Sequence, residues 1–183
     1  GIIMLAVVQL QQVVYPTLAV FVIVDKLQFS PRAYGYSALF VGLSYLVGSL
    51  VNRFLLNRFS SEKLVKIGGA LLTLGALFQF VLAATTPLNI ASLLFPAMIV
   101  QFSLGFIFGN VLGACLKFFP QNAAMSVALQ TGLLMLISAS GLFMLTQVRV
   151  EHLSQFGLIY FTLAATLCTV MYFANQRIFA ITA

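Results

Sequence analysis

The chain has 183 residues, of which 62% are hydrophobic and only 7% are charged. Soluble domains carry about 25% charged residues, so this composition excludes an ordinary water-soluble globular protein. The net charge of +6 would indicate a nucleic-acid partner in a soluble chain, whereas here the orientation of a membrane protein explains it better.

Six long apolar segments follow one another along the chain, and every charged residue lies outside them. They cover residues 1–24, 34–51, 67–84, 90–116, 123–146 and 156–174. Each has the length that an α-helix needs to cross a hydrocarbon core of about 30 Å. Backbone groups in lipid must be hydrogen-bonded within their own segment. We therefore predict an all-α integral membrane protein, in which residues 1–183 form a single bundle of six transmembrane helices.

Basic residues are distributed unevenly between the two sides of this predicted bundle. One side carries Arg53, Arg58, Lys63, Lys66, Lys117 and Arg177. The other side carries Lys26, Arg32 and Arg149. The positive-inside rule then places both ends of the chain in the cytoplasm. The chain opens with Gly1 directly at a predicted span, which favours a fragment of a longer protein.

The first segment contains a stripe of polar residues at helical spacing. Gln9, Gln12 and Tyr15 lie on one face together with Pro16, whereas Gln11 points elsewhere. Because proline has no N–H, Pro16 should bend the helix and free the carbonyl near Gln12. Amides in lipid need partners, so the stripe faces either a neighbouring helix or a wet cavity.

The second segment is expected to begin at Ser30-Pro31, because serine caps free N–H groups and proline suits the first turn. Tyr45 within it is a candidate for contact with a substrate, although such a tyrosine can equally be a packing residue. The fourth segment offers Gln101 as a hydrogen-bonding candidate and Phe108 as an apolar wall. In the fifth segment, Gln130 is a further cavity candidate.

Small residues in the fourth segment predict close helix packing. Gly105, Gly109 and Gly113 repeat at four-residue spacing, which lets two helix backbones approach each other. Asn110 lies on the opposite face and is expected to bond another helix. The third and sixth segments have fewer polar groups and are expected to be mainly lipid-facing.

The connection after the second segment has two interpretations. Gly48, Asn52, Arg53 and Arg58 form its pattern. Its cations could serve topology alone, since they anchor to headgroups and fix orientation. Alternatively the arginines form a cytoplasmic latch between helices by bonding helix-end carbonyls or acidic partners.

Chemistry-bearing groups are scarce. The predicted spans contain no ionisable acid or base of the kind that usually carries proton relays in membranes. His152 is the only histidine, and one histidine cannot form a metal site. We therefore expect no enzyme activity, no cofactor and no metal.

The pattern of Gly48, Asn52-Arg53 and Arg58 resembles the loop between the second and third helices of each half of major facilitator transporters. Ser30–Gly35 resembles the entry to the eighth helix of drug:proton antiporters, the bicyclomycin and chloramphenicol exporter type above all. The run from Gly105 to Gly132 is similar to their tenth and eleventh helices. The chain then corresponds to the C-terminal six helices, seven to twelve. Asn52 stands where the family has aspartate, so the charged part of the loop motif is absent.

This resemblance implies multidrug efflux in a bacterial inner membrane: proton-driven export of small organic molecules by alternating access between two six-helix halves. The partners would be the missing N-terminal half, protons and the substrate. Helices one, two, four and five would border the central cavity. The candidates for that cavity are Gln9, Gln12, Tyr15, Tyr45, Gln101, Phe108 and Gln130.

Two alternatives stay open at this point. A non-transporting six-helix scaffold or assembly protein also fits the missing intramembrane charge and the glycine-rich packing faces. A half-size transporter could instead work as a dimer with twelve spans.

Overall fold

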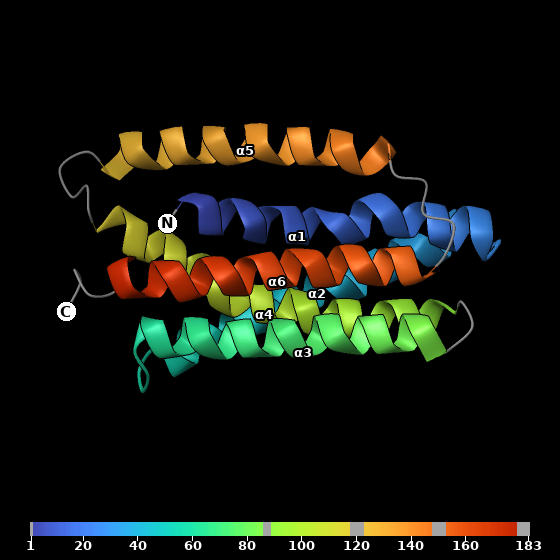
Figure 1. Cartoon of the computed structure of the whole chain (residues 1–183), viewed down its shortest axis with the longest axis horizontal. Helices are drawn as coiled ribbons and strands as arrows, with labels where there is room; N and C mark the ends of the chain where they lie inside the picture. The colour runs from blue at the N-terminus through green and yellow to red at the C-terminus, as the bar shows by residue number, and fades with distance from the viewer. Residues whose placement is uncertain (1, 86–88, 118–122, 148–152, 179–183) are drawn as a thin grey trace.

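The computed structural model describes residues 2–85, 89–117, 123–147 and 153–178. Helices account for nearly all of them (Figure 1). The elements are α1 (Ile2–Val20), the π-helix η1 (Phe21–Lys26) that continues it, α2 (Pro31–Leu55), α3 (Ser61–Thr85), α4 (Ile90–Leu116), α5 (Ala123–Gln147) and α6 (Leu153–Ile178).

The described helices agree with the predicted membrane-spanning bundle. Five of them are long and apolar enough to cross a bilayer: Ile2–Lys26, Pro31–Leu55, Ser61–Thr85, Ile90–Leu116 and Ala124–Met144. In α6 the apolar stretch identified is the shorter Gly157–Met171. The described part of the chain is thus an all-α helical bundle in which five helices have the length and composition to span a membrane.

Several helices extend beyond the predicted segments because they continue past the apolar core into charged residues. At its start α2 includes Arg32, and at its end it includes Arg53. The first turn of α3 carries an ion pair of 2.7 Å between Lys66 Nζ and Glu62 Oε1, at the i,i+4 spacing that supports a helix. The predicted segments stop at the charged residues, whereas the helices continue through them.

The start of α2 forms as its sequence predicts. Ser30 has extended backbone angles and its Oγ accepts a hydrogen bond of 3.4 Å from Ala33 N, while Pro31 opens the helix. Similarly, Asn89 caps α4 in a reciprocal arrangement with Ser92. The turns expected at Thr86-Pro87 and Phe119-Pro120 lie outside the described residues.

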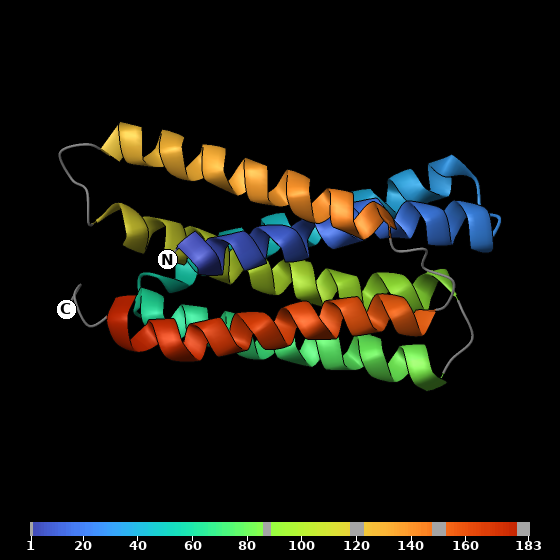
Figure 2. The same cartoon turned by 45° about the horizontal axis from the view of Figure 1, so that its top comes forward.

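The helices run roughly parallel or antiparallel, with α1 and α4 in the interior (Figures 1 and 2). α3 packs against α4 and α6, while α5 stands at the edge of the bundle and packs mainly against α1. The start of α1, the α2–α3 turn and the end of α6 lie at the same end of the molecule (Figure 1). α2 and α5 are the least covered of the long helices.

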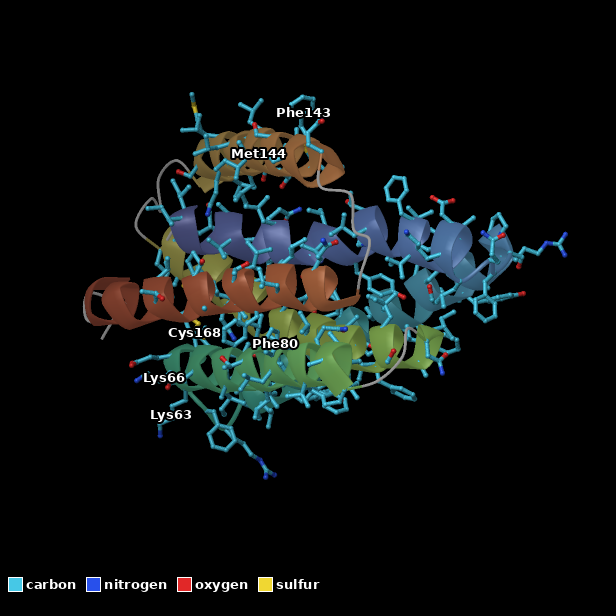
Figure 3. All side chains as sticks on the ribbon, turned by 45° about the vertical axis from the view of Figure 1, so that its right-hand side comes forward. Lys63, Lys66, Phe80, Phe143, Met144 and Cys168 are labelled. Carbon is cyan, nitrogen blue, oxygen red and sulfur yellow. The ribbon has the colours of Figure 1, made fainter. Side chains whose placement is uncertain are left out.

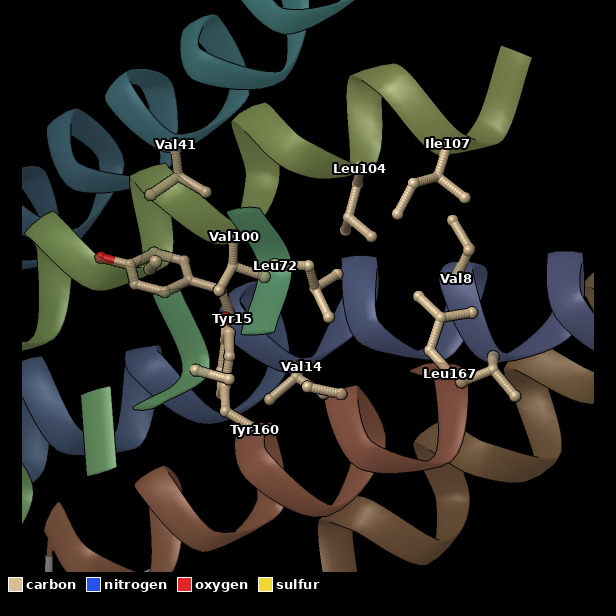
Figure 4. Packing of buried hydrophobic residues seen from close by; sticks show 14 of the residues in the cluster. Val8, Val14, Tyr15, Val41, Leu72, Val100, Leu104, Ile107, Tyr160 and Leu167 are labelled. Atoms are coloured by element: carbon tan, nitrogen blue, oxygen red, sulfur yellow. The ribbon is translucent and has the colours of Figure 1, made fainter. Parts of the chain in front are cut away.

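An apolar core joins α1, α3, α4 and α6. It includes Val8 and Tyr15 of α1, Leu104 of α4, and Tyr160 and Leu167 of α6, all of them almost fully buried (Figure 4). α3 also places Gly69 against Met171 of α6. Consequently α3 and α6 each have a face covered by protein, and the expectation that they are mainly lipid-facing stays a prediction for their outer sides.

Candidate functional site

Pro16 leaves a free backbone acceptor in α1, as the sequence predicts. Pro16 has no N–H to donate to the Gln12 carbonyl four residues earlier. Gln101 Nε2 of α4 donates to that carbonyl instead, at 3.1 Å. A second side chain reaches the same region, since Tyr34 Oη of α2 donates to the Pro16 carbonyl at 2.9 Å. One turn later α1 widens into the π-helix η1.

α1, α2 and α4 therefore meet beside Pro16. Tyr45 of α2 is the third member of this group, because its hydroxyl lies beside the side chain of Gln12. Ser49 Oγ donates to the Tyr45 carbonyl at 3.0 Å. We call Gln12, Tyr45 and Gln101 the polar junction. It lies midway along α1, α2 and α4 and consists of uncharged groups.

Burial separates the seven predicted cavity residues into two sets. Gln9, Gln12, Tyr45 and Phe108 are half-buried and retain exposed surface. The buried set is Tyr15, Gln101 and Gln130, which are 0%, 3% and 7% exposed. A ligand can touch the first set directly. The second set can act only by supporting its neighbours, unless the helices move.

The buried set is held in different ways. Gln101 donates to the Gln12 carbonyl. Tyr15 lies close to Ser37 and packs beside Tyr160 within the core, the latter shown in Figure 4. Gln130 of α5 has a buried Nε2 without a hydrogen-bond partner among the described residues. Gln11 is 1% exposed and both of its amide atoms lack such a partner. Sequence reasoning set Gln11 aside, although its deep burial in α1 makes it a notable residue.

Glycines fix the crossing of α2 and α4. A Cβ at Gly48 would collide with the backbone carbonyl of Phe102. In return, a Cβ at Gly105 would lie 2.6 Å from Ser49 N and 2.9 Å from the Tyr45 carbonyl oxygen. Backbone contacts at Gly48 and Gly105 therefore fix how closely α2 packs against α4 beside Tyr45. Gly109 and Gly113 have no such neighbour within 4 Å, so the close approach predicted for them is not seen in this chain.

The predicted cytoplasmic latch has a different chemistry in the structure. Asn110 Nδ2 of α4 donates to Asn52 Oδ1 at 2.8 Å and to the Phe106 carbonyl at 2.7 Å. Both asparagines are buried, whereas Arg53 and Arg58 are exposed. About one helical turn beyond Gly48 and Gly105, the contact that joins α2 to α4 is thus a neutral amide pair. It also gives Asn110 the interhelix bond that its sequence position predicts.

Replacing Asn110 by leucine should destabilise the bundle by about 1–2 kcal/mol, because Asn52 Oδ1 then stays buried without a donor. Reversible unfolding of the purified protein in mixed micelles measures this change. The double variant Asn52→Leu/Asn110→Leu should be no less stable than Asn110→Leu, since both polar partners are removed. A double variant that loses a further 1–2 kcal/mol would show that the two amides act independently.

Metal-binding groups are sparse in the part of the chain that the structure describes. There, no three side chains of histidine, cysteine, aspartate or glutamate gather into a possible metal site. His152 lies outside the described residues. Cys115 and Cys168 are free thiols, and Cys168 Sγ lies 3.0 Å from Thr73 Oγ1 across the α3–α6 contact.

Comparison of the chain with protein-family models, with curated proteins and with solved structures found no match.

Proposed function

We propose that this chain is the C-terminal six-helix half of a secondary active transporter that exports small organic molecules. The polar junction supports this proposal most strongly. Midway along α1, next to Pro16, this helix meets α2 and α4. Gln12 and Tyr45 of the junction keep part of their surface exposed, and so do the candidates Gln9 and Phe108. Broken helices with free backbone groups often border the substrate sites of transporters.

The uneven coverage of the helices also supports a second half. α2 and α5 leave most of their surfaces uncovered within the chain, although both are among the helices that the resemblance assigns to the central cavity. A matching six-helix half would cover them. Proton coupling would then rely on acids of that half, since Asp25 and Glu62, the acids in the described part of the chain, lie at helix ends. The proposed location is a bacterial inner membrane with both chain ends in the cytoplasm.

Transport by the intact protein tests this function. In vesicles that contain the intact protein, an imposed proton gradient should drive the transport of ethidium, and the transport should stop when the gradient is removed. Tyr45→Ala should lower the rate at least tenfold while leaving the amount of protein in the membrane unchanged, because Tyr45 is an accessible member of the polar junction. Leu74→Ala, at an exposed apolar position of α3, is the matched control and should transport normally.

The scaffold alternative makes the opposite prediction. A non-transporting assembly protein would show no gradient-dependent flux of any tested solute, and Tyr45→Ala would behave like Leu74→Ala. Its exposed helix faces would instead bind other membrane proteins.

A further inference from the structure

Three fully buried polar side chains lie at one level of the bundle core, where α6 packs against both α1 and α3. They are Tyr15 of α1, Gln79 of α3 and Tyr160 of α6, and each has 0% of its surface exposed. We call these three residues the buried polar layer. It is separate from the polar junction, which shares none of its members.

The register between α3 and α6 brings Tyr160 to the level of Gln79. The ring centroids of Phe80 and Phe161 are 5.8 Å apart, and Figure 3 shows Phe80 at this contact between the two helices. A Cβ at Gly157 would lie 3.4 Å from the Gln79 carbonyl oxygen. Tyr160 follows Gly157 by three residues and so lies on the same side of α6.

Tyr15 completes the buried polar layer from α1. Its side chain packs beside Tyr160 in the core (Figure 4). Ser37 of α2 lies close to Tyr15, but Ser37 Oγ donates to the Tyr34 carbonyl at 2.7 Å. Polar groups of three helices therefore follow one another across the core, from Tyr15 through Tyr160 to Gln79.

Two polar atoms of this layer have no hydrogen-bond partner among the described residues. They are Tyr15 Oη and Gln79 Oε1. The other amide atom, Gln79 Nε2, makes one long hydrogen bond of 3.4 Å to the Ser92 carbonyl of α4. An unpaired hydroxyl or amide oxygen inside a protein is unfavourable, so buried groups of this kind indicate a bound partner.

We propose that the buried polar layer binds internal water. All three side chains are closed off from the surface, so a larger ligand could enter only if the helices separated. The layer contains no charged group that would hold an ion in a dry core. Internal waters bind otherwise unsatisfied groups through about three hydrogen bonds. Here water would donate to Gln79 Oε1, and the hydroxyls of Tyr15 and Tyr160 would supply its other contacts. The inference depends on the helical bundle and not on transport.

Radiolytic hydroxyl-radical footprinting of the intact purified protein tests this proposal. Radicals formed from a bound water oxidise the side chains beside it, even where bulk solvent has no access. Tyr15 and Tyr160 should therefore be oxidised at least fivefold faster than Phe106, an aromatic side chain that is buried elsewhere in the bundle. Oxidation of both tyrosines no faster than that of Phe106 would overturn the proposal.

Two variants test the hydrogen-bonding groups separately. Tyr15→Phe removes a single oxygen and should fold, while Gln79→Leu removes the amide. Each should lower the oxidation of Tyr160 at least threefold, because the water loses one of its partners. Gln130→Leu, at a buried amide of α5, is the matched control and should leave the oxidation of Tyr160 unchanged. Unchanged oxidation of Tyr160 in Tyr15→Phe, or an equal loss in Gln130→Leu, would contradict water binding at the layer.

Discussion

Gly105→Ala is expected to destabilise the bundle by about 3 kcal/mol, the upper part of the range for overpacked sites. A Cβ at this position would lie 2.6 Å from Ser49 N, 2.8 Å from Gly48 C and 2.9 Å from the Tyr45 carbonyl oxygen. These are backbone atoms, which cannot rotate away as a side chain can. The helices α2 and α4 must therefore separate, which moves Tyr45 away from Gln12 and Gln101.

Gly109→Ala is the matched control for this prediction. Gly109 occupies the same helix one turn later and has nothing within 4 Å of its Cβ position. Alanine there should be neutral, or stabilising by about 0.5–1 kcal/mol through helix propensity. Unfolding in mixed micelles compares the two variants. Equal stability of Gly105→Ala and Gly109→Ala would mean that α2 and α4 do not cross at these glycines.

Gln101→Leu is expected to cost about 1.5 kcal/mol of stability, because it leaves the Gln12 carbonyl without a donor inside the bundle. It should also lower transport in the intact protein, since the polar junction then loses the contact between α1 and α4. Gln101 is 3% exposed, so its effect on a ligand is indirect and arises from the position of α1.

The proline provides a specific test of that explanation. In Pro16→Ala the new N–H at position 16 can donate to the Gln12 carbonyl within α1. Gln101→Leu should therefore cost less than about 0.5 kcal/mol in the Pro16→Ala background, which gives a clear coupling energy in a double-mutant cycle. Additive effects of the two substitutions would show that Gln101 is needed for packing and not for the freed carbonyl.

Local features of the fold could be read from the sequence because their causes lie within a few residues. The Ser30-Pro31 start of α2 depends on one cap and one fixed φ angle, and the free carbonyl at Gln12 follows from Pro16 alone. Lengths of apolar segments likewise indicate spanning helices. Segment ends were less accurate, because α2 and α3 continue through charged residues such as Arg53 and Glu62.

Features that depend on which helices meet could not be predicted in the same way. The spacing of Gly105, Gly109 and Gly113 is identical, but only Gly105 lies where α2 crosses. The sequence pattern groups Asn52 with Arg53 in a loop latch, whereas in the structure the partner of Asn52 is Asn110, 58 residues away. An apolar groove lined by α2, α3 and α4 corresponds to no sequence motif, because it results from the way these three helices pack together.

Water access to the polar junction tests the central claim most directly. Single cysteines at positions 9 and 45, in a background with Cys115 and Cys168 replaced by alanine, would be treated with a membrane-impermeant thiol reagent in sealed vesicles of both orientations. Thiolates form only where water reaches the thiol, so reaction reports a wet site. A cavity predicts reaction at both positions at least tenfold faster than at a cysteine in place of Leu74. Equally slow reaction at all three positions would contradict a substrate cavity and leave the junction as helix packing.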